Sequence, residues 1–386
     1  MNTKPIYLDY NATTPMDPRV TKAMIAYLKE NFGNPSSSHY YGKITKDAVS
    51  KARIAVAELI GAGQDEIIFT SGGSESNNMA IKGIAFANKD KGRAYRQAGN
   101  HIITSSIEHP SIINPCGYLE KFGFKTTYLP VDKFGLVSPK DVKKALTKET
   151  LLVTIMHANN EVGTIEPIAE IGEIVKKEGL YFHSDAAQSV GKIPTLVNEL
   201  RVDLLTIAAH KFYGPKGVGA LYIRQGTKID PLIHGASHEA GKRAGTENIA
   251  AVVGLAEAAR IAPNEMGEDS KRIQRLRDKL YAEIKNMAEV KLNGATDNRL
   301  PNTLNISFKN INGAELLAKL KGIAASTGSA CHEKESKVSG VLQAMGVKQD
   351  YAQGSIRFSL GKYTTEEDIN NALGQIAEAL LDKLFK

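Results

Sequence analysis

Short apolar runs rich in β-branched residues alternate with amphipathic stretches along most of this chain. Glycine, proline or polar residues bound the runs, as is typical of buried strands. Seven runs predict strands, at residues 67–70, 101–104, 125–129, 151–156, 181–183, 204–207 and 219–223. Helical patterns lie between several of them; one at residues 168–178 ends at Gly179. This alternation predicts an α/β fold with a mainly parallel seven-stranded sheet that helices cover.

The pattern changes after residue 262. Residues 262–267 contain Pro263 and Gly267 and predict a break in the helical pattern. A helix is expected next, with an apolar stripe formed by Ile273, Leu276, Leu280, Ile284 and Met287. Short strands at 303–308 and 356–359 and a C-terminal helix from Thr365 then indicate a smaller α+β domain.

We therefore expect two domains. The large domain comprises residues 14–262, and the small domain comprises residues 1–13 together with 263–386. In a parallel sheet covered by helices, ligands bind beyond the carboxyl ends of the strands. Candidate functional residues are expected at those ends.

Composition narrows the class of protein. With 386 residues, 42% of them hydrophobic and 24% charged, the chain is typical of a globular protein with a large core. The net charge of +7 comes from scattered lysines, which argues against a nucleic-acid surface. No apolar run approaches the ~20 residues of a membrane span, and no signal peptide is expected at the N-terminus. Two cysteines far apart give no disulfide framework and fit a reducing cytoplasm.

Two strand ends carry the clearest candidate chemistry. Asp185 follows the run at 181–183, and Lys211 follows the run at 204–207, just before a Gly-Pro-Lys-Gly turn. A cofactor with a cationic ring nitrogen and a reactive aldehyde needs a carboxylate and an amine close together, and pyridoxal 5'-phosphate (PLP) is such a cofactor. The aspartate would keep the ring nitrogen protonated, and the lysine would hold the aldehyde as a Schiff base.

Other interpretations of these two residues stay open at this point. An arginine, a helix N-terminus or a magnesium ion could pair with Asp185, although no second carboxylate lies nearby in the sequence. Lys211 could be an ordinary surface lysine. The ordered set of candidate residues at strand ends favours the cofactor.

Three further strand ends belong to that set. Residues 70–77 follow a strand, open a helix and include Gly73 and Ser74, so they could hold a phosphate; a capped helix after a tight turn is the alternative. His109 could stack on a cofactor ring and move protons, or could cap the next helix. Asn160 could donate to a cofactor oxygen, or could be a turn residue.

Three residues elsewhere stand out. Cys331 lies in a loop of small residues followed by charged ones, which suits an accessible thiolate; a buried structural cysteine is the alternative. Cys116 follows an apolar stretch and is expected to be inert packing. Arg357 lies within a strand pattern, where it could clamp a carboxylate or form an internal ion pair.

Taken together, these motifs resemble those of the PLP-dependent cysteine desulfurases of the nitrogen-fixation and iron–sulfur-assembly type, within the class-V aminotransferase group. The likeness covers essentially the full chain. The matching strings lie at residues 7–15, 33–39, 71–78, 108–109, 159–163, 185–188, 210–211, 243–248, 300–303, 328–331 and 357–359. The resemblance implies the fold-type-I architecture of PLP-dependent transferases.

The resemblance also implies roles for individual residues. Lys211 would bind the cofactor aldehyde, Asp185 would pair with the ring nitrogen, and His109 would stack on the ring and act in catalysis. Cys331 would be the nucleophile that accepts sulfur. The remaining cofactor ligands would be Gly73, Ser74, Asn160, Gln188, His210 and Thr246, the last from the partner subunit of a homodimer. Arg357 would clamp the substrate carboxylate, with Asn11 and Asn160 also binding substrate.

The activity implied is conversion of L-cysteine to L-alanine, with the sulfur left on Cys331 as a persulfide for an acceptor such as an iron–sulfur scaffold protein. The alternatives are a selenocysteine lyase acting on L-selenocysteine, a small-molecule aminotransferase of the same fold, and a non-catalytic binding protein. No metal site is expected.

The chain departs from the family pattern at two positions. Ala208 stands where the family commonly has a phosphate-binding serine, so one phosphate hydrogen bond is expected to be missing, and water or Ser74 would replace it. Cys331 is followed by His332, which resembles the selenocysteine lyases, whereas the loop length fits the desulfurases.

Overall fold

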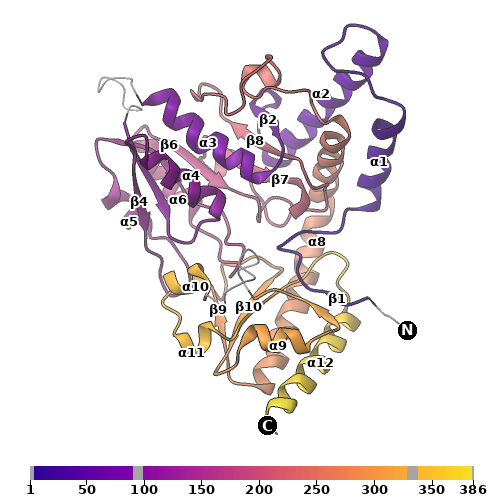
Figure 1. Cartoon of the computed structure of the whole chain (residues 1–386), viewed down its shortest axis with the longest axis vertical. Helices are drawn as coiled ribbons and strands as arrows, with labels where there is room; N and C mark the ends of the chain where they lie inside the picture. Colours follow the sequence, from indigo (N-terminus) through magenta and orange to yellow (C-terminus); the bar gives the residue numbers. More distant parts are fainter. Residues whose placement is uncertain (1–3, 90–98, 328–337, 385–386) are drawn as a thin grey trace.

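The computed structural model describes residues 4–89, 99–327 and 338–384. It has a larger part built on a seven-stranded sheet and a smaller part below it (Figure 1). The strands lie in the order β2-β8-β7-β6-β5-β3-β4. Their bounds are β2 (Ile67–Thr70), β3 (His101–Ser105), β4 (Lys125–Leu129), β5 (Thr150–Thr154), β6 (Tyr181–Asp185), β7 (Leu204–Ala208) and β8 (Gly219–Ile223). The predicted seven-stranded sheet is therefore confirmed.

The directions of the strands bring six carboxyl ends to one edge. Strand β8 is antiparallel to both of its neighbours, β2 and β7. All other neighbouring strands in this sheet pair in parallel. Strand β2 therefore runs in the same direction as β7, so β2, β3, β4, β5, β6 and β7 all end at the same edge.

Helices cover both faces of this sheet, so its central strands are buried throughout. Met79, Ile81 and Ile112 lie in the core of one face, which is covered by α3 (Gly73–Asn88) and α4 (Pro110–Glu120). The core of the other face includes side chains from α1 (Pro18–Lys29), α2 (Tyr40–Ile60), α5 (Pro139–Ala145), α6 (Ile168–Lys177), α7 (Val197–Leu200) and the first half of α8 (Ile249–Met287). The edge strand β4 exposes Lys125, a charge that discourages pairing with another chain.

The smaller part has its own sheet and core. Its strands β9 (Val290–Asn293), β10 (Thr303–Phe308) and β12 (Ser355–Ser359) pair antiparallel in the order β12-β10-β9. Strand β1 (Ile6–Tyr7) pairs in parallel with β11 (Ile323–Ala324), and Leu8 joins the same core as Phe358. Its helices are α9 (Gly313–Lys319), α10 (Gly340–Ala344), α11 (Gln349–Ala352) and α12 (Glu366–Leu384). The exact division of the chain into domains stays a prediction.

Three short 3₁₀ helices complete the described elements. They are η1 (Gln64–Glu66), η2 (Ala209–Lys211) and η3 (Glu239–Gly241). The second of them holds Lys211 directly beyond the end of β7.

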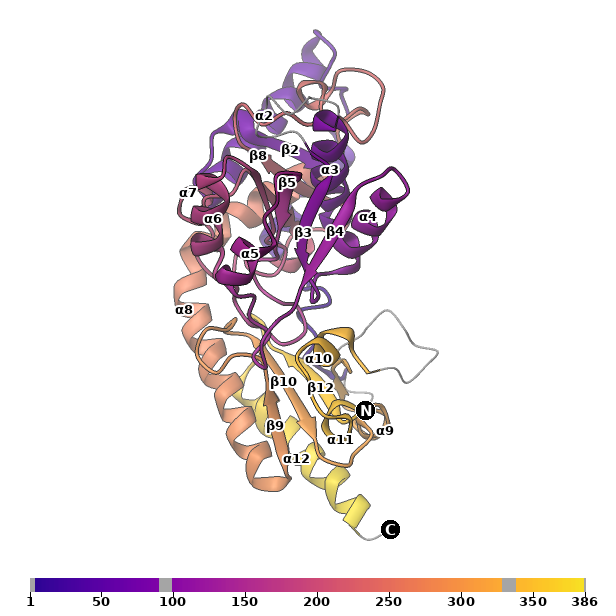
Figure 2. The same ribbon diagram turned by 90° about the vertical axis from the view of Figure 1, so that its left-hand side faces the viewer.

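The predicted helix break at residues 262–267 is wrong. Helix α8 is 39 residues long. It continues through Pro263 and runs along both parts of the molecule (Figure 2). A proline inside a helix costs about 3 kcal/mol, but tertiary contacts on both sides of Pro263 outweigh it here. Ala262 belongs to the hydrophobic core of the larger part, and Ile273 belongs to that of the smaller part. Between them, Glu265 forms ion pairs with Arg19 and Lys362.

No helix in the described ranges is long and apolar enough to span a membrane.

Candidate active site

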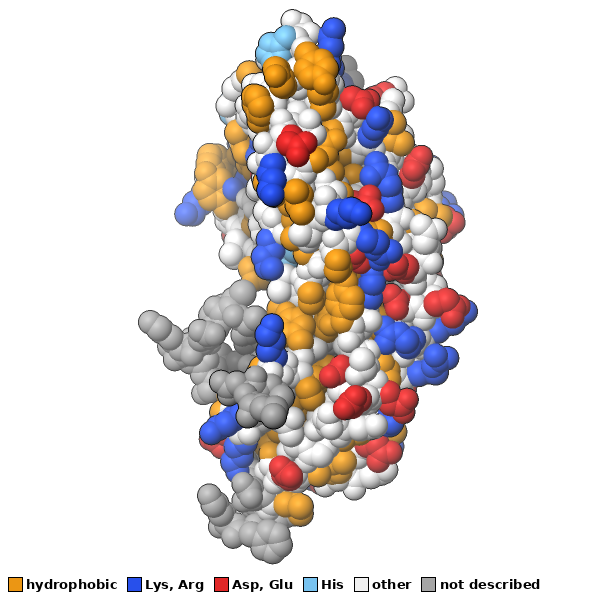
Figure 3. Space-filling model, turned by 90° about the vertical axis from the view of Figure 1, so that its right-hand side faces the viewer, with side chains coloured by type: hydrophobic (Ala, Val, Ile, Leu, Met, Phe, Trp, Pro, Cys, Tyr) orange, Lys and Arg blue, Asp and Glu red, His pale blue; other side chains and the backbone are white. Residues whose placement is uncertain are grey.

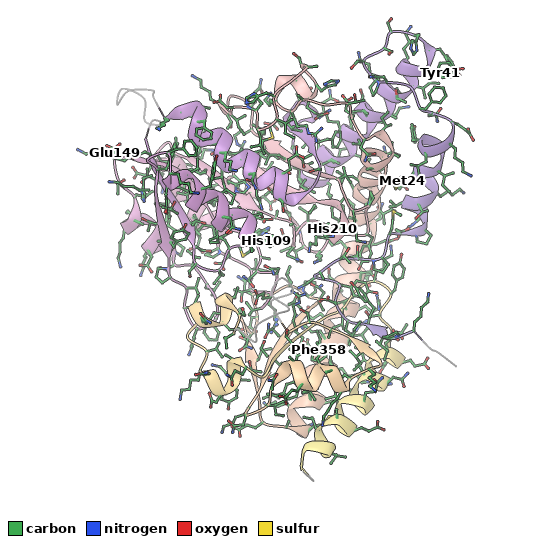
Figure 4. The ribbon with its side chains drawn as sticks, in the orientation of Figure 1. Met24, Tyr41, His109, Glu149, His210 and Phe358 are labelled. Carbon is green, nitrogen blue, oxygen red and sulfur yellow. The ribbon has the colours of Figure 1, made fainter. Side chains whose placement is uncertain are left out.

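Candidate residues from five strands gather at the common carboxyl edge of the sheet. Gly73 follows β2, His109 follows β3, Asn160 follows β5, Asp185 ends β6 and Lys211 follows β7. Figure 4 labels His109 and His210 at this edge, between the sheet and the smaller part of the molecule. The charges of Asp185 and Lys211 both act on the pKa of His109.

The turn between β2 and α3 has the form of an anion site. Gly72 has φ of 146°, a conformation that favours glycine, and no side chain caps α3 at its N-terminus. A Cβ atom at Gly73 would lie 3.5 Å from the Cβ atom of Ala208, so Ala208 borders this turn. Ser74 is exposed in the first turn of the helix. Backbone N–H groups and the helix dipole can hold a phosphate here.

Asp185 is a buried carboxylate held by neutral donors. Its side chain is 7% exposed. The Ala187 backbone N–H donates to Oδ1 at 2.9 Å, and Asn77 Nδ2 donates to Oδ2 at 2.7 Å. Within the described part of the chain, Asp185 forms no ion pair, so the arginine alternative is not found there. A buried carboxylate without a cation has room for the protonated nitrogen of a ligand.

His109 caps α4, as the alternative interpretation predicted. The Ser111 backbone N–H donates to His109 Nδ1 at 3.1 Å, and Ser111 Oγ lies 2.7 Å from the same atom. Burial lowers the pKa of His109, assisted by Lys211 and opposed by Asp185. A neutral imidazole is therefore the favoured form.

A chain of hydrogen bonds joins Asp185 to His109 through two residues that sequence reasoning gave no role. Asn77 Nδ2 donates to Asp185 Oδ2 and also to Ser111 Oγ, the latter at 2.8 Å. Because Ser111 Oγ accepts from Asn77, its own proton is directed to His109 Nδ1, which places the imidazole proton on Nε2. Asn77 stood in a motif that the sequence singled out, but its partners Asp185 and Ser111 lie far away in the chain.

Lys211 is held by the N-terminal segment. Its Nζ donates to the backbone carbonyls of Asn11 and Ala12 at 2.7 and 2.9 Å. The neighbouring His210 contacts Thr13 Oγ1 through Nδ1 at 3.1 Å. Burial, together with the positive charges of Lys211 and other lysines, lowers the pKa of His210 to about 4. A neutral His210 therefore lies beside the candidate nucleophilic amine.

Asn11 connects the lysine to the smaller part of the molecule. Its carbonyl accepts from Lys211 and from Gln188 Nε2. Its side-chain Nδ2 donates to the Asn160 carbonyl at 3.0 Å and to Thr303 Oγ1 at 2.8 Å. Because protein groups already occupy this amide, the structure gives Asn11 an organising part in addition to the substrate-binding role that was expected.

Arg357 is buried, with 2% exposure, and it forms the internal ion pair that was one of its two interpretations. Nη2 donates to Asp9 Oδ1 at 2.7 Å, and Nη1 donates to the Asn160 carbonyl at 3.0 Å. Its Nε is buried without a hydrogen-bond partner among the described residues. A buried donor without a partner is costly, so this guanidinium retains capacity to bind a carboxylate.

Two expected site residues are not joined to this cluster. Thr246 is exposed, and no described hydrogen bond links it to the turn at Gly73 and Ser74. Cys331 lies outside the described residues. The buried position expected for Cys116 is confirmed, and burial raises the pKa of its thiol to about 12.

The described residues fit PLP. An anion site at the start of α3, a carboxylate without a cation at Asp185 and an amine at Lys211 match the phosphate, the ring nitrogen and the aldehyde of that cofactor. Ala208 leaves space beside Gly73 but adds no donor. In the described ranges, no group of three or more histidine, cysteine, aspartate and glutamate side chains is arranged to hold a metal ion.

Comparison with known proteins gives consistent matches. The model of the aminotransferase class-V family matches residues 6–372. A protein of Dictyoglomus turgidum named cysteine desulfurase IscS is 55% identical over 382 residues, which cover 98% of this chain and 95% of the relative. The protein of the same name from Methanosarcina thermophila is 49% identical over 377 residues, covering 97% and 92% of the two chains.

Solved structures agree with these sequence matches. A structure described as a NifS-like protein superposes with a TM-score of 0.91 and 42% identity, over 98% of this chain and all of the other. A structure described as SspA in complex with cysteine has a TM-score of 0.83 and 38% identity, over 94% of this chain and all of the other.

Proposed function

Because this chain belongs to the class-V aminotransferase family, we propose that it is a PLP-dependent cysteine desulfurase, which converts L-cysteine to L-alanine and transfers the sulfur to Cys331. One observation carries the proposal for the described site. Lys211 donates to the Asn11 carbonyl, while the Asn11 side chain and Arg357 Nη1 both donate to the Asn160 carbonyl. Lys211, at the amine end of an α-amino acid, and Arg357, at its carboxylate end, are thus joined by one network of hydrogen bonds.

Each side chain has a defined task in this reaction. PLP, when bound, supplies a ring that stabilises negative charge at the substrate Cα atom. Asp185 holds the proton on the ring nitrogen, and Arg357 orients the substrate carboxylate. The Lys211 amine takes the proton from Cα. His109 presents Nε2–H to the site as a proton donor.

The sulfur transfer balances without an external oxidant or reductant. The Cβ–S bond of the substrate breaks, and a bond forms between that sulfur and Cys331 Sγ. The substrate Cβ gains a proton and becomes the methyl group of alanine. The cysteine thiol and the Cys331 thiol thus yield one methyl group and one persulfide.

The test follows the product and the protein together. After treatment with L-cysteine, wild-type holoenzyme should release alanine, and Cys331 should gain the mass of one sulfur atom. Lys211→Ala should lose the visible absorbance of the lysine-bound cofactor and form no alanine. Cys331→Ala should bind the cofactor normally but fail to turn over cysteine.

Other outcomes would contradict the proposal. Turnover of L-selenocysteine by Cys331→Ala and wild type alike, with no turnover of cysteine, would instead support a selenocysteine lyase. Amino transfer that needs a keto acid and not Cys331 would support an aminotransferase.

We also propose that the protein acts as a homodimer. Large apolar side chains on α1, at the start of α2 and in the segment between them are exposed, and Figure 3 shows hydrophobic side chains gathered on this face of the molecule. The most exposed are Leu28 at 68%, Phe32 at 73% and Tyr40 at 71%. An exposed apolar patch of this kind fits a subunit interface. Thr246 would then reach the cofactor phosphate of the partner subunit. Sedimentation of the full chain measures the assembly.

The persulfide on Cys331 must pass its sulfur onward before the next turnover. We propose an acceptor protein such as an iron–sulfur scaffold, and action in the cytoplasm. A reducing compartment fits a chain with two cysteines, of which Cys116 is a buried thiol outside any disulfide.

A further inference from the structure

Lys192 lies beside the candidate site in the turn after β6, and the roles described above do not include it. Its Nζ donates to Gln188 Oε1 at 2.7 Å and lies 3.4 Å from Asn11 Oδ1. Among the residues that the structure describes, Lys192 forms no ion pair with a carboxylate. Burial, followed by the charges of Lys211 and Arg357, lowers the pKa of Lys192 well below its usual value. A cation in such a place is costly and calls for a function.

The contacts of Lys192 determine which way the amide of Gln188 faces. Gln188 Oε1 accepts from Lys192, and Gln188 Nε2 donates to the Asn11 carbonyl at 3.0 Å. A carbonyl can only accept, and a protonated lysine side chain can only donate. Rotating the amide by half a turn would put its NH₂ group against Lys192 and its oxygen against the Asn11 carbonyl. Both contacts therefore select the same orientation.

This orientation directs an N–H donor toward the reacting amine. Gln188 Nε2 and Lys211 Nζ both donate to the same Asn11 carbonyl, at 3.0 and 2.7 Å. An amide nitrogen carries two hydrogens, so Nε2 keeps a second N–H for a ligand at Lys211. If the amide faced the other way, an oxygen would take that place and could not donate.

We propose that Lys192 is a positioning residue that acts through Gln188: it holds the amide of Gln188 with its NH₂ group on the side of Lys211, where that group can donate to an oxygen of the bound cofactor. The inference rests on the proposed function. It adds to that function a residue that need not touch substrate.

The experiment replaces Lys192 alone and then together with Gln188. Lys192→Met keeps the length of the side chain and removes the donor and the charge. We expect the dissociation constant of PLP to rise about tenfold, as for the loss of one hydrogen bond to a charged group. The visible absorbance maximum of the lysine-bound cofactor should also shift.

A double-mutant cycle identifies the route of the effect. Gln188→Leu should reproduce both changes, and adding Lys192→Met to Gln188→Leu should change PLP affinity by less than about twofold. Lys192→Gln, which restores an N–H donor without the charge, should recover part of the affinity and the original absorbance. Lys140→Met changes an exposed lysine in the same way and should leave both quantities unchanged.

Two results would overturn the proposal. One is a Lys192→Met holoenzyme with wild-type absorbance and affinity; the other is an effect that adds fully to that of Gln188→Leu. Either result could occur in an enzyme that still forms alanine from cysteine, so failure of this inference is distinguishable from failure of the proposed function. A melting curve for each variant separates either result from loss of folding.

Discussion

The side of the site around Asp185 and the side around Lys211 hold opposite charges in different surroundings. We call the first the anionic side (Asp185, Asn77, Ser111 and His109) and the second the cationic side (Lys211, Lys192, Gln188 and Arg357). On the anionic side, neutral amide, hydroxyl and imidazole groups form one connected chain. On the cationic side, backbone carbonyls of the N-terminal segment and of Asn160 accept from the cations.

The difference shows what kind of ligand completes the site. Asp185 has no cationic partner in the described chain, and Arg357 has a carboxylate partner on one nitrogen but none on Nε. A ligand with a cationic ring nitrogen at one end and a carboxylate at the other would satisfy both sides. PLP together with an α-amino acid has that distribution of charge.

The largest expected effect comes from removing the charge of the anionic side. Asp185→Asn keeps the shape of the side chain but leaves no anion to stabilise a protonated ring nitrogen. We expect alanine formation from cysteine to fall about a thousandfold, as for loss of one partner of a buried charge pair. Steady-state kinetics of the holoenzyme measure this change.

The matched control is Asp203→Asn. Asp203 lies immediately before β7 and accepts from the Phe182 backbone N–H, and its replacement should leave the rate of alanine formation near that of wild type. Equal losses in the two variants would mean that the two sides of the site do not differ in the way described.

A smaller effect concerns Glu108, a second buried carboxyl group. Burial, assisted by the charge of Asp185, raises its pKa to about 8 from 4.5. Its Oε1 accepts from Ser105 Oγ and from the Met156 N–H, while Oε2 has no described partner. The folded state therefore binds a proton that the unfolded state releases between pH 4.5 and 8. Glu108 thus favours folding at low pH, and this contribution is lost as pH rises through that window.

Glu108→Gln removes the titration and keeps an acceptor at Oε1. Relative to wild type, the free energy of unfolding of the variant should rise by about 1 kcal/mol per pH unit across the window and level off above it. Denaturant melts at several pH values measure the difference. Glu120→Gln, at an exposed position of α4, should show no such trend. A flat difference for Glu108→Gln would mean that Glu108 is ionised in the folded protein and adds a second charge to the anionic side.

The smallest expected effect lies at the anion site, outside both sides. Ala208→Ser places a hydroxyl beside Gly73, where Ala208 now presents only a methyl group. One added hydrogen bond to the cofactor phosphate should lower the dissociation constant of PLP about fivefold. Equilibrium dialysis of PLP against apoprotein measures this, and Ala208→Gly serves as the control without a hydroxyl. Unchanged affinity in Ala208→Ser would show that the phosphate does not reach this position.

The sequence predicted the strands of the main sheet because each is a compact apolar run bounded by turns. It failed at Pro263, because local helix signals could not reveal the packing of Ala262 and Ile273 or the ion pairs of Glu265. Tertiary contacts between distant segments therefore keep α8 helical through Pro263, against the local signals.

In the site, Asp185 and Lys211 could be identified from their places at strand ends. Asn77, Ser111 and Lys192 were not given roles. Ser111 and Lys192 contact His109 and Gln188, two and four residues away, but the chain of contacts that gives each a role also needs partners that only the fold brings near. Asn77, for example, meets Asp185 across 108 positions of sequence. The clue available for Ser111 was its place two residues after His109, where it joins a helix cap.

The chain of bonds from Asp185 to His109 turns the histidine into an internal reporter. A cation that binds Asp185 draws electron density from that carboxylate, and the change is relayed through Asn77 and Ser111, since bonds in a chain polarise one another. The nitrogen resonances of an isotopically labelled His109 would then respond to events at a carboxylate that the imidazole does not touch. Magnetic resonance could follow the charge on the far side of the site in this way, without an added probe.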